Sequence, residues 1–137
     1  MINAMTISIS GLHASAARLS ASASNVANAR TRGALPTNAS PDAPAFYAPV
    51  DVVQTSIGES GGVAGVAVTY VPRTPAYVAA YDPGEPFADA RGMVAAPNVD
   101  LAEEAVSQIA AAMSYRANLA ALKLEVETAK ELLDVLA

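Results

Sequence analysis

The chain has 137 residues and a net charge of −5, and 53% of its residues are hydrophobic. It is long enough for one small domain. No clustered Lys/Arg face could displace counterions from phosphates, which excludes a nucleic-acid partner. With no Cys and a single His, it lacks the residues of a disulfide framework, a multi-His or thiolate metal site, or a cysteine nucleophile. We therefore expect no metal, no cofactor and no enzymatic activity.

The first predicted element is a helix from about residue 3 to residue 28. Its apolar residues recur at alternating steps of four and three, which is a heptad seam: Met5, Ile9, Leu12, Ala16, Leu19, Ala23 and Val26. Asn28 is a plausible stop signal because it tolerates left-handed backbone angles. Many serines weaken this helix in isolation, so it needs a packing partner, and we expect that partner to be the helix at the other end of the chain.

The middle of the chain predicts loop and strand. Residues 31–49 carry four prolines and read as loop. β-branched and aromatic runs at 50–54, 65–71 and 76–81 predict a small antiparallel unit of about three strands. The glycines at 58, 61, 62 and 65 suit a hairpin turn better than a phosphate loop, because no Gly-Lys-Ser/Thr follows them. Residues 82–97 are predicted to return to the last helix as loop.

The last predicted element is a long helix that follows Pro97 and contains neither Gly nor Pro. Asp100, with Glu103 three residues later, predicts a capping box, and Asn98 is an alternative cap. Broken only by Gln108, one heptad seam runs the whole length: Leu101, Ala105, Ala112, Tyr115, Leu119, Leu122, Val126, Ala129, Leu133 and Leu136. A helix of about 58 Å, at about 1.5 Å per residue, is much longer than a small globule needs.

A second apolar row lies on another face of this helix and stops where Glu127, Glu131 and Asp134 begin: Val106, Ala110, Met113, Ala117, Ala120 and Leu124. A helix that is apolar on several sides must be surrounded by other protein, so we expect it to pack against neighbouring chains. The charges near its end are predicted to form a solvated face, with i,i+4 pairs between Lys123 and Glu127 and between Lys130 and Asp134.

The predicted fold class is α+β, with two long terminal helices and a small antiparallel β insert. Residues 1–30 and 98–137 form one coiled-coil core, and residues 31–97 form the loop and β-rich insert. Asparagines are candidates for caps and interhelical hydrogen bonds. We predict an assembly interface made of these residues: Met5, Ile9, Leu12, Leu19, Val26, Asn25, Asn28, Asn98, Asp100, Leu101, Ile109, Met113, Tyr115, Asn118, Leu119, Leu122, Val126, Leu133 and Leu136.

Several stretches resemble a known family. The run from Ser22 to Gly33 is similar to the N-terminal signature of the flagellar rod, hook and hook-associated proteins, with Arg32-Gly33-Ala34 in place of the usual Pro-Gly-Tyr. Residues 81–94, 97–104 and 114–118 resemble the short proximal rod proteins of the basal body. The resemblance implies terminal helices packed as coiled coils in an axial tube, with the β insert facing outward. It also implies partners among rod proteins and copies of itself, and export through the flagellar type III apparatus to the periplasmic rod.

Two alternatives remain at this stage. The same helices could belong to a secreted or periplasmic coiled-coil module that grips an export substrate outside the rod.

A cleaved signal peptide is not expected, because the residues before Ala21-Ser22-Ala23 lack a cationic start and a continuous apolar run. No apolar run approaches the ~20 residues of a membrane span, so we expect no membrane insertion. An enzyme is disfavoured by the missing Cys and the single His.

Overall fold

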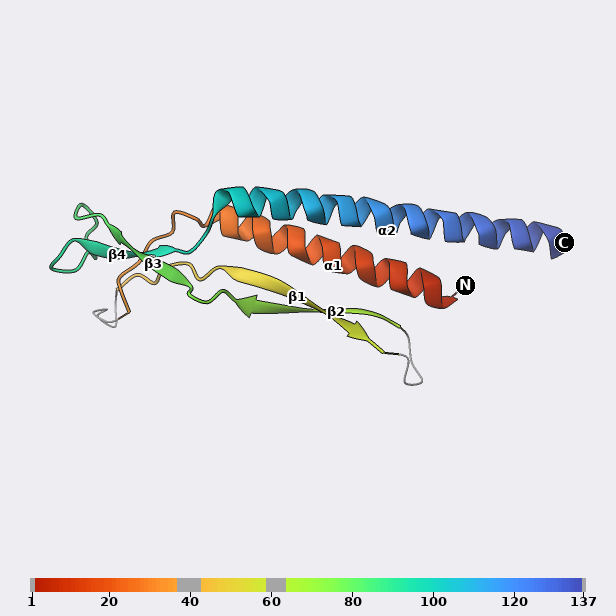
Figure 1. Cartoon of the computed structure of the whole chain (residues 1–137), viewed down its shortest axis with the longest axis horizontal. Coiled ribbons are helices and arrows are strands. Elements are labelled where there is room, and N and C mark those ends of the chain that lie inside the picture. The colour runs from red at the N-terminus through yellow and green to blue at the C-terminus, as the bar shows by residue number, and fades with distance from the viewer. Residues whose placement is uncertain (1, 37–42, 59–63, 137) are drawn as a thin grey trace. The chain divides into compact units, whose positions relative to one another are not determined.

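The computed structural model describes residues 2–36, 43–58 and 64–136 (Figure 1). The elements follow one another as α1 (Ile2–Ala27), β1 (Val50–Ile57), β2 (Gly65–Pro72), β3 (Tyr77–Tyr81), β4 (Met93–Pro97) and α2 (Leu101–Leu136). This order confirms the α+β class, with a long helix at each end and a small β insert. Part of the hairpin turn predicted at the 58–62 glycines lies outside the described residues, and so do the side chains of residues 2, 3 and 136.

The chain divides into two compact units. Unit 1 consists of Met1–Ser20, Val52–Tyr70 and Val106–Ala137, and unit 2 consists of Ala21–Asp51 and Val71–Ala105. In unit 1, α1 contacts both other parts. Its Ser8 hydroxyl donates to Glu125 Oε1 of α2 at 3.2 Å, and its Ser10 hydroxyl accepts from the Val66 N–H of β2 at 3.1 Å. In unit 2, β3 and β4 pair antiparallel, with Tyr77 opposite Pro97 and Tyr81 opposite Met93.

The end of α1 and the start of α2 lie where the sequence predicts. Asn28 closes α1, because its side-chain amide and its backbone N–H both donate to the Ser24 carbonyl at 3.0 Å. Asp100 caps α2, since its Oδ1 accepts from the N–H groups of Ala102 at 2.8 Å and Glu103 at 3.2 Å. The alternative cap was wrong: the Asn98 side chain donates instead to the Pro75 carbonyl at 2.9 Å.

One strand was missed. We expected residues 82–97 to be loop, but Met93–Pro97 forms β4. The Gly33 N–H donates to the Ala95 carbonyl at 3.0 Å, and the Ala95 N–H donates to the Gly33 carbonyl at 2.9 Å. β4 therefore has neighbours on two sides. Because Val94 and Ala95 are both fully buried, the strand lacks the apolar–polar alternation that marks a half-exposed strand.

Gly11 sets how closely α1 and α2 approach in unit 1. A Cβ at this position would lie 2.6 to 2.8 Å from the Asn118 side-chain amide, which is closer than atoms can pack. Asn118 is held there by a hydrogen bond from its Nδ2 to the Ser114 carbonyl at 2.9 Å. The small residue therefore permits a contact that any other side chain would push apart.

We expect Gly11→Ala to lower the free energy of unfolding by about 1 kcal/mol. Overpacking costs about 1–3 kcal/mol, which exceeds the ~1 kcal/mol that Ala gains over Gly in a helix. Urea unfolding followed by circular dichroism measures the change. In the Gly11→Ala/Asn118→Ala double variant the clash is removed, so it should be more stable than Gly11→Ala alone. A double variant no more stable than the single would show that the close approach does not matter.

Candidate assembly surfaces

Small and polar residues join α1 to α2 in unit 1. Ser8, Ala14, Ser15 and Ala111 are buried there, and Gly11 lies against Asn118. On α2 the buried Ala111 and the half-buried Asn118 and Glu125 are seven residues apart, as are Ser8 and Ser15 on α1. The internal contact therefore uses a heptad row that is different from the apolar seam. In this row Glu125 Oε1 accepts a hydrogen bond from Ser8. Its other oxygen, Oε2, is buried without a hydrogen-bond partner among the described residues.

The apolar seam of α1 is left largely uncovered. Ile9 and Leu19 are each 42% exposed, whereas Met5 and Leu12 are half-buried. We predicted that this seam would belong to the contact with the last helix. The two helices do pack together, but the seam borders their contact instead of filling it, because the small residues allow a closer approach than branched side chains would.

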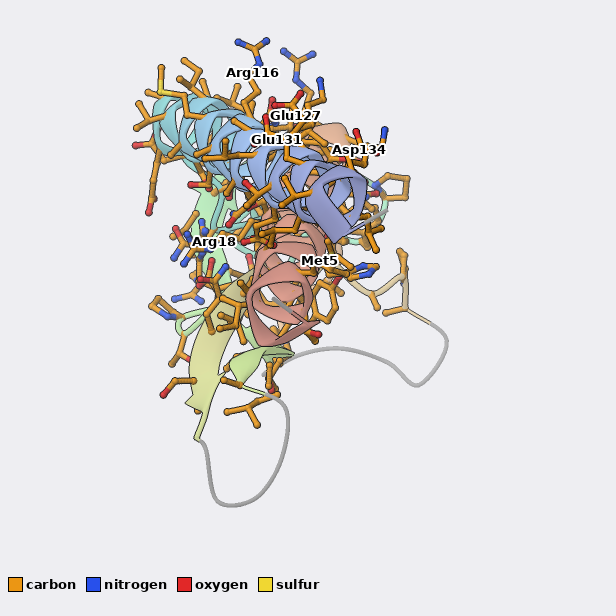
Figure 2. All side chains as sticks on the ribbon, turned by 90° about the vertical axis from the view of Figure 1, so that its right-hand side faces the viewer. Met5, Arg18, Arg116, Glu127, Glu131 and Asp134 are labelled. Carbon is orange, nitrogen blue, oxygen red and sulfur yellow. The ribbon has the colours of Figure 1, made fainter. Side chains whose placement is uncertain are left out.

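The side of α2 that carries the second apolar row is also uncovered. Val106 is 67%, Ile109 58% and Met113 64% exposed, and Leu124 follows at 64%. Farther along the same side the residues become acidic. Figure 2 shows Arg116, Glu127 and Glu131 projecting from α2 away from α1. The predicted i,i+4 pairs were wrong: neither Lys123 with Glu127 nor Lys130 with Asp134 is among the ion pairs of the described residues.

The remaining predicted interface residues divide by burial. Leu119, Leu122 and Asn118 are half-buried. Val26 of α1 is exposed. The other described apolar members of α2 are exposed as well: Leu101, Tyr115, Val126 and Leu133. Leu136 was also predicted, but its side chain lies outside the described residues. Single aliphatic residues on a surface are normal, but rows of them at helical spacing form an apolar patch of the kind found at interaction sites.

Unit 2 contains a buried polar network centred on Asn25, which is 1% exposed. Its Nδ2 donates to the Val50 carbonyl at 3.0 Å and to Glu104 Oε1 at 2.9 Å. Its Oδ1 accepts from the Val50 N–H and from the Tyr47 hydroxyl, both at 3.0 Å. These bonds satisfy all four hydrogen-bonding positions of the amide. Asn25 thus fastens the end of α1 to the start of α2 and to β1, instead of facing a partner.

Glu104 extends this network to a cation. It is 2% exposed, and its Oε1 accepts from Arg73 Nη2 at 3.0 Å, while the same nitrogen donates to Asp51 Oδ1 at 2.6 Å. The hydrogen bond to Asp51, with the charges of Asp51 and Glu104, raises the pKa of Arg73 although burial opposes it. Ser22 donates to the Glu104 carbonyl at 3.1 Å. The sequence prediction missed Glu104, although it lies seven residues before Ala111 on the buried row.

Among the described residues no three His, Cys, Asp or Glu side chains gather to hold a metal ion, and His13 is exposed. Over the same ranges, neither helix combines the length and the apolar character needed to cross a membrane. Arg32, which replaces the proline of the family signature, forms an ion pair with Asp82.

Known proteins provide the decisive comparison. No family model matches the chain. It is 36% identical over 123 residues to the flagellar basal-body rod protein FlgC of Escherichia coli O6:H1, a match that covers 89% of this chain and 87% of that protein. The chain belongs to the FlgC family of flagellar basal-body rod proteins. It is 35% identical over 127 residues to the FlgC protein of Aquifex aeolicus, a match that covers 93% of this chain and 90% of that protein.

The FlgC family gives the exposed rows a context. The FlgC protein of Yersinia enterocolitica is 37% identical over 123 residues, again covering 89% of this chain. These matches span nearly the whole chain, so the resemblance predicted from residues 22–33 and from the second half is confirmed.

Proposed function

We propose that this chain is a structural subunit of the rod of the bacterial flagellar basal body, held in place by the outer rows of α1 and α2. The observation that carries this proposal is that the helices use different faces for the contact within the chain and for their exposed apolar rows. The contact within the chain uses Ser8, Gly11, Ser15 and Ala111, while most of the branched aliphatic residues of the two seams are exposed. Membership of the FlgC family supplies the assembly that would cover them.

In this role the subunit transmits torque and performs no chemistry. Close-packed helices resist bending, because protein interiors pack as densely as organic crystals and transmit strain. The polar groups that the structure buries in unit 2 bond to one another and to the backbone, which suits a structural joint. Except for Asn25, which is buried within unit 2, the residues predicted at the interface, from Met5 to Leu136, remain our proposal for the surfaces that meet neighbouring rod subunits and further copies of this chain.

We also infer that the subunit reaches the periplasm through the flagellar type III apparatus without a cleaved signal. A chain without cysteine suits passage as an unfolded polypeptide into an oxidising compartment, because it cannot be trapped by wrong disulfides. The alternative, a binding or export-chaperone module outside the rod, is not favoured by any observation.

The test is incorporation into the basal body. In a strain deleted for its own copy of the gene, we expect a tagged version of the full chain to restore motility and to be recovered with rods in purified basal bodies. The tagged chain with unit 2 disrupted by Asn25→Ala provides a control for folding. Recovery of the intact chain only in soluble fractions, bound to export substrates, would overturn the proposal in favour of the alternative.

A further inference from the structure

A polar pocket lies within unit 1, where α1, α2 and the two strands β1 and β2 meet. It has a volume of about 230 Å³, and all three parts contribute to its lining, with Arg18 from α1, Gln54 from β1 and Ser114 from α2. In Figure 2, Arg18 lies beside α1, between α2 and β1. Pockets for drug-sized ligands have volumes of about 300–1,000 Å³, so this one has room for a single side chain or a small ion.

The polar side chains of the lining fall into two groups. The Ser15 hydroxyl donates to a carbonyl of its own helix at 2.8 Å, and Asn118 Nδ2 donates to the Ser114 carbonyl at 2.9 Å. By contrast, the side chains of Arg18, Gln54 and Ser114 make no hydrogen bond or ion pair with the residues that the structure describes. Hydrogen-bond donors from three separate elements therefore line one pocket without a partner in that part of the chain.

Arg18 brings a positive charge that no nearby carboxylate balances. Its side chain is half-buried. None of the residues that line the pocket is acidic, and neither α1 nor the strand residues 52–57 and 65–70 include an Asp or a Glu. A charge that is withdrawn from water is costly unless it is paired.

The acidic residues of α2 are too far away to pair with Arg18. Glu104 precedes Ser114 by ten residues and Glu125 follows it by eleven, which places them about 15 and 16 Å away along the helix axis at about 1.5 Å per residue. Both carboxylates already accept hydrogen bonds from other side chains. The later acidic residues of α2, and Lys130 among them, lie farther still. Between the two glutamates α2 carries only positive charges: Arg116 and Lys123.

The apolar part of the lining favours a side chain over a free ion. Ile7, which is 44% exposed, lines the pocket together with Ala14 and Val66. The methylene groups of an acidic side chain can pack against these residues while its carboxylate meets the donors. A free inorganic anion has no apolar surface and would leave the same residues in contact with water.

We propose that this pocket receives one glutamate or aspartate side chain from a neighbouring protein of the rod. The carboxylate pairs with the Arg18 guanidinium, whose N–H groups match its two oxygens, and accepts hydrogen bonds from the Gln54 amide and the Ser114 hydroxyl. The proposal rests on the proposed function and adds a specific polar contact to its apolar surfaces. Because a guanidinium left unpaired in a dry interface is costly, the pocket selects a neighbour with an acidic residue at this place.

Zero-length cross-linking tests this contact, because a carbodiimide joins an amine only to a carboxylate that touches it. Arg18→Lys keeps the charge and supplies the amine. The reagent activates the carboxylate, and the amine displaces the activating group to form an amide bond. In basal bodies purified from the complemented strain, we expect a linked product that the unchanged chain does not give. Peptide mass spectrometry should place the link between position 18 and an Asp or Glu of another rod protein.

A second variant keeps the test open if Arg18→Lys fails to fold. Gln54→Lys alters an exposed position, places an amine on the β1 wall of the same pocket and leaves Arg18 intact, so it should give a link to the same carboxylate. Adding Ser114→Leu, which fills the pocket, is expected to lower the yield of this link at least tenfold per incorporated chain. Thr69→Lys, at an exposed position of β2, is the control and should not give it.

The outcomes separate this proposal from the proposed function. Rods that contain the Arg18→Lys and Gln54→Lys chains but give no link to another protein would overturn the pocket contact and leave the proposed function standing. A site for a free ion would overturn it as well, and would appear as thermal stabilisation of the unchanged free chain, but not of Arg18→Gln, by acetate or phosphate at constant ionic strength. Absence of the unchanged chain from basal bodies would overturn both.

Discussion

Asn25→Ala will lower the free energy of unfolding by about 3–5 kcal/mol. The substitution removes four hydrogen bonds from a site that is 1% exposed. It leaves the Val50 N–H, the Val50 carbonyl and one bond of Glu104 without their partner, and each buried polar group left unsatisfied costs about 1–3 kcal/mol. Urea unfolding followed by circular dichroism provides the measurement.

Asn28→Ala is the matched control for this effect. Asn28 stands three residues later and is half-buried, and its side chain donates to the Ser24 carbonyl at the end of α1. Its Oδ1 also accepts from the Thr31 hydroxyl at 3.3 Å in an exposed bond, so the loss of Asn28 should cost about 1 kcal/mol, typical of a helix-end hydrogen bond. Equal effects of the two substitutions would show that the Asn25 network does not hold unit 2 together.

The second large effect is expected on assembly, with little change in the stability of the free chain. Val106→Asp/Met113→Asp places two charges on the outer row of α2, where the two side chains are 67% and 64% exposed. Exposed substitutions usually change stability by less than about 0.5 kcal/mol each. In the rod the same charges would be buried without partners, at a cost of several kcal/mol. We expect basal bodies to lose the chain and motility to stop.

Two comparisons make this result specific to the outer row. Met113→Leu keeps an aliphatic side chain of similar volume and should support normal motility. Thr69→Asp adds a charge at an exposed position of β2 and tests whether any new charge is harmful. Normal rods in the Val106→Asp/Met113→Asp strain would mean that this side of α2 faces solvent in the assembly.

The helices could be predicted from the sequence, but the face that joins them could not. Periodicity and caps located both elements, because Asp100 and Asn28 act locally. The contact face was misjudged because hydrophobicity singles out the row with the largest aliphatic residues. In unit 1 the helices meet through Ser8, Gly11 and Ala111, where small side chains permit close approach, and many of the larger aliphatic side chains stay exposed.

Tertiary context decided the other differences. Met93–Pro97 becomes a strand because Gly33 and β3 pair with it from two sides, and no local pattern announces those partners. Glu104 is an acidic residue in the first turn of α2, yet it is 2% exposed and bonded to Asn25 and Arg73. Its position on the row of Ala111, Asn118 and Glu125 was the only local sign of its role.

Hydrogen exchange along α2 tests most directly whether neighbouring chains complete these helices. Few contacts within the chain cover residues 126–135 of α2, so their amides should exchange fast in the free chain at low concentration. In purified rods we predict exchange slower by a factor of about 100 or more over the same residues, as burial by neighbours stabilises the helix by about 2.7 kcal/mol or more. Equal and strong protection in the free chain and in the rod would contradict the account.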